Sequence, residues 1–339
     1  ERVESVRLTP KKPIVCDDDV TEDNAFYYLR QLPAVFDGKP LPDDNDWRGE
    51  WNTLSEMGLA GGPYPDMDEA VELLKPALEL ARKAESCSGC QVITVLGFDY
   101  LLPYLSPVRN TVQLLCYKTV KLAEEGQWEN ATDALNTAMT LSVDVQQGGV
   151  LINHLVGLAA CSSVSETMRR ICEDFSPPED VQNRFIELLD WAENSMQALS
   201  ETMRYEYLPI PRTIEMLYEN PGLLNGEDDV DNPTAWFYGR LLLAIGNSTP
   251  ETTKEHLAAV YSHLIYALEL PLPQSRRYLS DFFDDVEGIF NQRMVAMFDD
   301  PLGRLLVALM VPAMDRFYER HLENVCELRA SQLVLAARL

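Results

Sequence analysis

The chain has 339 residues, of which 46% are hydrophobic and 24% are charged, a composition that excludes a disordered or fibrous protein. Its 54 Asp and Glu residues outnumber 28 Lys and Arg residues, and the net charge of −26 argues against binding to nucleic acid, because such a surface repels phosphate backbones. No apolar run reaches the length of about 18 residues that a transmembrane helix needs, so we expect no transmembrane segment.

Residues 1–66 are rich in residues that break helices. The breakers are Pro10, Pro13, Pro33, Pro40, Pro42, Gly61, Gly62, Pro63 and Pro65. This pattern predicts an extended N-terminal arm with one short helix near residues 22–31, followed by a helical domain at residues 67–339. The polar start at Glu1 is expected for a mature chain whose targeting segment has been removed, or for a truncated chain.

From residue 66 onward, apolar residues recur at the three- and four-residue steps of helices. The segment 70–81 forms one apolar helical face, with Asp66 or Asp68 placed to cap it and Pro76 expected to kink it. Further helices are predicted at residues 106–125, 128–146, 151–174, 178–205, 234–245, 250–268, 275–298 and 302–339. We therefore predict an all-α fold.

Two of the predicted helices share one pattern. Residues 70–80 and 131–141 both follow Ala-x-x-x-Leu-x-x-Ala, then Leu or Met, x, Leu. The second copy follows a helix and a tight turn at residues 124–128, as in tetratricopeptide (TPR) hairpins, where alanine allows close helix contact. Because the regular period of about 34 residues is absent, we predict an irregular helical bundle or short α-solenoid with one TPR-like hairpin.

Residues 107–171 carry three consecutive patterns: Leu-Ala-x-x-Gly at 122–126, the alanine and leucine pattern at 131–141, and Leu-Ile-x-x-Leu-Val-Gly at 151–157. This stretch resembles a family of helical, TPR-like proteins abundant in planctomycetes. The closing helix at residues 316–339 is similar to the last helix of that family. The resemblance implies export behind an N-terminal signal or anchor, to the periplasm or cell surface, and it implies no established activity.

Seven cysteines are present, so at least one has no intramolecular partner. Cys87 and Cys90 form a CxxC pair at a predicted helix end, and three interpretations remain open: a local disulfide or buried thiols, a redox pair, or half of a zinc site. No second ligand pair stands at zinc spacing, and Gln91 occupies the histidine position of the c-type haem motif. Cys161 and Cys172 are expected in the core.

The most enzyme-like stretch is an acidic and aromatic segment at residues 281–287. Its carboxylates are Asp281, Asp284, Asp285 and Glu287. An aspartate pair beside phenylalanines is how all-α terpenoid synthases hold magnesium-diphosphate, but Gly288 replaces the third carboxylate of that motif. The alternative is a solvated acidic helix face with Phe282 and Phe283 turned to the core.

A second acidic cluster, formed by Asp228, Asp229 and Asp231, follows Gly226 in a predicted loop. Its oxygens would suit a weakly held calcium ion, although acidic loops are commonly only hydrated. An EF-hand-like start at residues 44–49 lacks ligands at its fifth and twelfth positions. Calcium is therefore the one cofactor that we consider.

An aromatic and basic cluster ends the predicted helix 178–205. Its members are Arg204, Tyr205, Tyr207 and Arg212. Such residues favour interfaces, and both a peptide groove and a well-packed corner fit this pattern. Among the histidines, His154 is expected in the core, while His256 and His263 are two helical turns apart and do not form an i, i+4 chelating pair.

We find no catalytic motif: HExxH, GxSxG, GxGxxG and Walker A patterns are all absent. The sequence favours a non-catalytic helical scaffold or assembly subunit that mediates protein–protein interaction, with a partner or by self-assembly, outside the cytoplasm. The alternative is an exported metal-dependent enzyme or ligand-binding protein that uses the acidic cluster around Asp284. A deep pocket that joins those acids to a histidine would favour the alternative.

Overall fold

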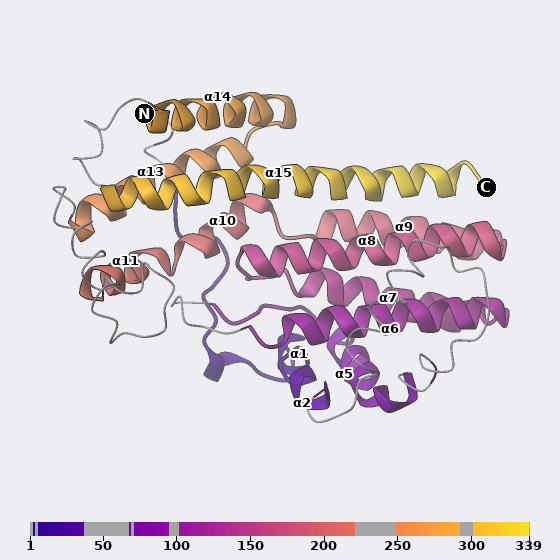
Figure 1. Cartoon of the computed structure of the whole chain (residues 1–339). Helices are drawn as coiled ribbons and strands as arrows, with labels where there is room; N and C mark the ends of the chain where they lie inside the picture. The colour runs from indigo at the N-terminus through magenta and orange to yellow at the C-terminus, as the bar shows by residue number, and fades with distance from the viewer. Residues whose placement is uncertain are drawn as a thin grey trace. The chain divides into compact units, whose positions relative to one another are not determined.

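The computed structural model describes residues 3, 6–36, 68, 71–94, 102–220, 249–291 and 301–338, with side chains described outside 284–291 and 301–313. Within these ranges the chain forms helices and turns without a strand, and an isolated bridge joins Asn24 to Gly89 (Figure 1). The all-α prediction is confirmed. None of the described helices combines the length and hydropathy of a membrane span, in agreement with the expectation of no transmembrane segment.

Contacts divide the chain into two compact units that are interleaved along the sequence. Unit 1 comprises residues 1–14, 94–100 and 198–320, and unit 2 comprises residues 15–93, 101–197 and 321–339. The last helix, α15 (Pro301–Ala336), contributes residues to both units. The boundary that we expected near residue 66 lies outside the described residues.

Unit 2 is built around four long helices that run side by side (Figure 1). Its elements are η1 (Asp17–Asp19), α1 (Phe26–Leu29), α2 (Leu32–Phe36), α5 (Lys75–Glu85), α6 (Leu105–Glu124), α7 (Trp128–Asp144), α8 (Leu151–Asp174), α9 (Glu179–Ser195) and the end of α15. α6 packs against α7 and α8, and α7 packs against α8 and α9. Small residues such as Ala131, Ala134 and Ala138 are buried on α7, where they permit this close packing.

The turn between α6 and α7 has the backbone geometry of a helix end closed by glycine. Gly126 has a φ of +73°, a left-handed conformation that glycine adopts without strain. The Gln127 N–H donates to the Leu122 carbonyl at 2.8 Å, and the Gly126 N–H donates to the Ala123 carbonyl at 3.0 Å. These two bonds form a Schellman motif, which reverses the chain from α6 into α7.

The crossing of α7 and α8 depends on Gly157 of α8. A Cβ atom at this position would lie 2.6 Å from the Ser142 carbonyl oxygen and 2.3 Å from Cγ of Gln146, both closer than atoms pack. The Ser142 carbonyl oxygen belongs to the backbone, so a change of side-chain rotamer cannot relieve its overlap with the added Cβ atom. Glycine therefore sets how closely the two helices approach.

Unit 1 contains an extended N-terminal segment and a second group of helices. Its helices are α10 (Leu199–Tyr207), α11 (Ile210–Glu219), α13 (Pro250–Leu268), α14 (Leu272–Asn291) and the first part of α15. α13 packs against α10, α11 and α14. Its start is fixed by Thr249, whose side chain accepts from the Thr252 N–H at 3.2 Å, and by Pro250 in the first turn.

Proline acts differently from our expectation in two places. Pro76 does not kink a continuous helix: the helical path is interrupted at Leu74, and Pro76 lies in the first turn of α5, where its missing N–H costs nothing. The predicted helix 178–205 is two helices, α9 and α10. Pro209 and Pro211 stand at the start of a further helix, α11, which was not predicted. The predicted helix 234–245 lies outside the described residues.

Candidate functional site

α10 is buried along most of its length, including two of its three charged residues. Every residue from Leu199 to Tyr205 is buried, and Arg204 and Glu201 are only 1% and 6% exposed. Charged side chains are rarely buried to this extent unless they are paired. The contacts that compensate this burial therefore mark the candidate site of unit 1.

The Glu201 carboxylate binds the backbone of the N-terminal segment. Its Oε1 accepts from the N–H groups of Lys11 and Lys12, at 2.5 and 3.2 Å. The local sequence is Pro-Lys-Lys-Pro over residues 10–13, and proline has no N–H. One buried carboxylate thus takes both backbone donors that this tetrapeptide has.

Arg204 and Tyr205 bind carbonyl groups of the same segment. The Arg204 Nε donates to the carbonyl of Arg7 at 2.9 Å, and the Tyr205 hydroxyl donates to the carbonyl of Pro13 at 3.2 Å. We call residues 7–13 the strap. The strap is held through its backbone at both ends and in the middle.

A network of ion pairs completes the site. Glu269, which follows α13, accepts from the Lys11 ammonium and from Nη2 of Arg204 through one oxygen, each at 2.8 Å. Arg204 also lies 3.4 Å from the second carboxylate oxygen of Glu201. Partial burial raises the pKa of Glu269, but the hydrogen bonds and charges of Lys11 and Arg204 together lower it by more than burial raises it. The pKa of Glu269 therefore lies below its ordinary value. We call Glu201, Arg204, Tyr205 and Glu269 the clamp.

Comparison with protein-family models, curated proteins and solved structures gives no match to this chain. The clamp is therefore interpreted from its own chemistry.

The clamp includes two of the four residues of the predicted aromatic and basic cluster. Arg204 and Tyr205 each donate a hydrogen bond to the chain's own strap. Tyr207 is half-buried, with its ring centroid 5.3 Å from that of Tyr261, and Arg212 is exposed on α11. Neither of these makes a described contact with the strap.

Cys87 and Cys90 are half-buried thiols that do not form a disulfide. The Cys87 thiol donates to the carbonyls of Glu22 and Lys83, each at 3.4 Å. Burial, followed by the charges of Asp144 and Asp23, raises the pKa of Cys87, so the thiol is protonated at neutral pH. A reactive cysteine needs the opposite shift, and this environment does not activate the thiol.

The predicted acidic clusters lie mostly outside the residues whose side chains are described. Asp281 is exposed on α14, whereas the side chains of Asp284, Asp285 and Glu287 are not described, nor is the loop with Asp228, Asp229 and Asp231. Among the described side chains, no three His, Cys, Asp or Glu residues gather as a metal site. The calcium and metal hypotheses remain predictions.

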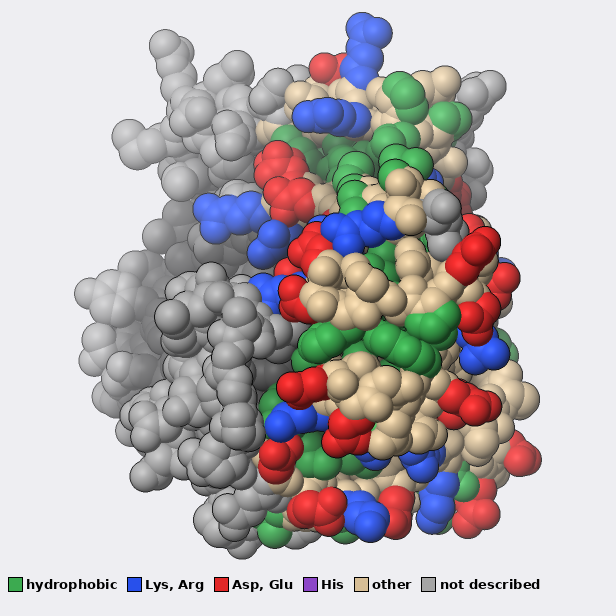
Figure 2. Space-filling view, turned by 90° about the vertical axis from the view of Figure 1, so that its right-hand side faces the viewer, with side chains coloured by type: hydrophobic (Ala, Val, Ile, Leu, Met, Phe, Trp, Pro, Cys, Tyr) green, Lys and Arg blue, Asp and Glu red, His purple; other side chains and the backbone are tan. Residues whose placement is uncertain are grey.

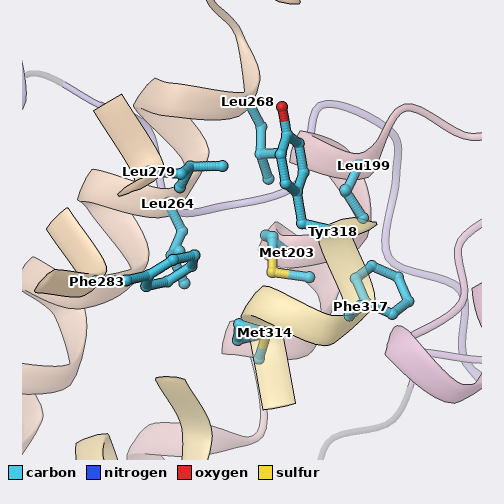
Figure 3. A pocket seen from close by; sticks show the side chains of 9 residues that line it. All are labelled: Leu199, Met203, Leu264, Leu268, Leu279, Phe283, Met314, Phe317 and Tyr318. Carbon is cyan, nitrogen blue, oxygen red and sulfur yellow. The ribbon is translucent and has the colours of Figure 1, made fainter. Parts of the chain in front are cut away.

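A small apolar cavity of about 10 Å³ lies among α10, α13, α14 and α15 of unit 1 (Figure 3). It is lined by Leu199, Met203, Leu264, Leu268, Leu279, Phe283, Met314, Phe317 and Tyr318. The one polar group of these side chains, the Tyr318 hydroxyl, lies 3.2 Å from the Ser275 hydroxyl. Ligand sites are typically larger, at about 300–1,000 Å³, and contain convergent polar groups, so we assign no ligand to this cavity.

In unit 2, several polar contacts join α8 to the end of α15, and we call three of them the seam. His154 and His321 lie 3.1 Å apart, the Asn324 amide donates to the Leu158 carbonyl at 2.9 Å, and the hydroxyls of Ser165 and Ser331 lie 2.8 Å apart.

Both histidines of this seam are neutral at physiological pH. Burial, and then the neighbouring His321, lower the pKa of His154 well below its ordinary value. Burial lowers the pKa of His321 to about 4. His154 is fully buried, as expected from the sequence. In the neutral pair, a ring N–H of one histidine donates to the ring nitrogen of the other. The pair is therefore an uncharged hydrogen bond that joins the two helices.

Proposed function

We propose that this protein is a non-catalytic helical scaffold or assembly subunit that mediates protein–protein interaction. The observation that supports this proposal most directly is the clamp, which holds the strap, a segment without helix or strand, through its backbone N–H and carbonyl groups. Main-chain recognition of an extended peptide is a common way for proteins to bind partners, because it does not depend on every side chain of the partner.

The helices of unit 2 provide a second argument. The hairpin of α6 and α7 has a short glycine turn and buried alanines, in keeping with a TPR-like unit, and α8 and α9 pack beside it. Stacked helical hairpins present extended surfaces that suit protein partners. Trp191 on α9 is 40% exposed, and tryptophan is among the residue types that contribute most to binding at interfaces.

The surface charge bears on the kind of partner. Figure 2 shows one face, on whose described part Asp and Glu side chains are spread, with Lys and Arg among them and hydrophobic side chains between. With a net charge of −26, the protein attracts basic partners at long range. We place the scaffold outside the cytoplasm, on the strength of the family resemblance of residues 107–171.

The test is the native mass and composition of the untagged chain, purified from its source by gentle size fractionation and examined by native mass spectrometry. We expect a stoichiometric protein partner or a defined homo-oligomer, and cross-linking would then locate the contact surface. A lone monomer that carries a metal ion or small molecule would contradict the proposal and direct attention to the acidic residues around Asp284.

A further inference from the structure

We infer that the clamp is a docking site for a non-helical basic segment of a partner protein, of the Pro-Lys-Lys-Pro type, and that the chain's own strap is a replaceable occupant. This inference rests on the proposed function and names the chemistry of the partner at one site. The argument has three steps: what an open clamp requires, why the strap can leave, and why the occupant is a basic partner.

An open clamp requires a specific kind of occupant. Without the strap, the Glu201 carboxylate would lose two N–H donors while only 6% exposed, and an uncompensated buried carboxylate is strongly unfavourable. The four charged groups Lys11, Glu201, Arg204 and Glu269 balance each other, so removal of Lys11 leaves one excess negative charge. The occupant must therefore supply two consecutive backbone N–H groups and a cation.

The strap is attached in a way that allows exchange. Of residues 7–13 only Pro10 is buried, and the Lys11 side chain is 61% exposed. Its described polar attachments are hydrogen bonds and an ion pair, which salt and competing ligands weaken more readily than buried apolar contacts, and Pro10 is its one buried apolar side chain. Because the strap belongs to the same chain, it competes at an effective concentration in the millimolar range.

Charge favours a basic partner over a second copy of this chain. Two copies that each carry a net charge of −26 repel one another, whereas a basic protein is attracted and its lysines complement Glu269. The prolines at both ends of the motif fix their own φ angles before the segment binds, so less conformational entropy is lost on docking.

The experiment uses the full chain and a fluorescein-labelled peptide with the sequence of residues 7–14, and follows binding by fluorescence anisotropy. Substitution of both Lys11→Pro and Lys12→Pro removes the two N–H donors and opens the clamp, and we expect this variant to bind the peptide at least tenfold more tightly than the unaltered chain. The matched variant, Lys11→Ala with Lys12→Ala, keeps both N–H groups. We expect its affinity for the peptide to lie between that of the unaltered chain and that of the proline variant.

Two further comparisons test the mechanism of recognition. A peptide N-methylated on the backbone at both lysines keeps its charges but lacks the two N–H donors, and we expect it not to bind. In the opened chain, Glu201→Gln should weaken peptide binding at least tenfold, whereas Arg212→Ala, outside the clamp, should leave it unchanged. Equal binding of both peptides, or no binding to an opened chain that keeps its helical circular dichroism, would overturn the inference.

If the opened chain loses its helical signal, Lys11→Glu takes its place, since it weakens the strap without altering the backbone, and the same outcomes apply. Light scattering separates the two sources of an occupant: a dimer of the unaltered chain that disappears in the opened variant would identify a second copy and overturn the assignment to a basic partner. A native assembly that persists in the Glu201→Gln chain would show that the clamp is not the site of assembly, and it would overturn this inference without contradicting the proposed function.

Discussion

Asp144 lies at the end of α7, and its ionisation is expected to destabilise the fold. Burial raises the pKa of this carboxyl from 3.8 to about 7. The folded chain therefore keeps the proton up to about pH 7, whereas the unfolded chain releases it near pH 3.8. The stabilisation that the protonated group contributes is fully present below pH 3.8 and is lost as the pH rises through about 7.

The size of this effect follows from the pKa difference. A difference of about 3 pKa units, at about 1.36 kcal/mol each, gives a loss of up to about 4 kcal/mol above pH 7. Asp144→Asn has nearly the same shape and carries no charge at any pH. We expect it to be close to neutral at pH 4 and to raise the free energy of unfolding by about 2–4 kcal/mol at pH 8.

The assay is equilibrium urea unfolding of both chains at pH 4, 5, 6, 7 and 8, followed by circular dichroism. The difference between the two chains is the quantity of interest, because it cancels the titration of other groups, including the histidines of the α8–α15 seam. A difference that stays constant from pH 4 to pH 8 would refute the reasoning. A direct check is the ¹³C titration of the Asp144 carboxyl, which should have its midpoint near pH 7.

Three further substitutions test other contacts. Burial lowers the pKa of His321 from 6.5 to about 4, so the free energy of unfolding should fall by up to about 3 kcal/mol as the pH drops through this window. His321→Gln should make the free energy of unfolding depend less on pH, as measured by urea unfolding at pH 7 and pH 4. Gly157→Ala should cost about 2 kcal/mol in thermal unfolding despite better helix propensity, whereas Gly89→Ala, with no atom within 4 Å of the added Cβ, should cost little. Arg204→Met should cost about 3 kcal/mol in urea unfolding, because it leaves the Glu201 carboxylate buried beside an apolar side chain, and an unchanged midpoint would contradict this account.

Much of the fold could be predicted because its signals are local. The limits of α8 and α13 agree with the predicted residues 151–174 and 250–268, since proline, glycine and the helical spacing of apolar residues fix them within the segment itself. α11 was not predicted, although its two prolines stand where proline is well tolerated, at the start and in the first turn of a helix. The break between α9 and α10 has no proline or glycine to mark it.

The candidate site could be predicted only in part. Arg204 and Tyr205 were identified by residue type, but Glu201 and Glu269 carry no signal that separates them from other acids of this chain. Glu201 lies 190 residues from Lys11, and Glu269 lies 258 residues from it. Contacts over such separations depend on tertiary packing, which no local pattern encodes.

The seam between α8 and α15 has a consequence for the order of folding. Its three polar contacts join residues separated by 167, 166 and 166 positions, and the two helices run in the same direction across it. A long loop must close before any of these contacts forms, and a slip of one helical turn would displace all three together. During synthesis, α8 therefore emerges with this polar face uncovered, and the face finds its partner only after residues 321–331 have left the ribosome.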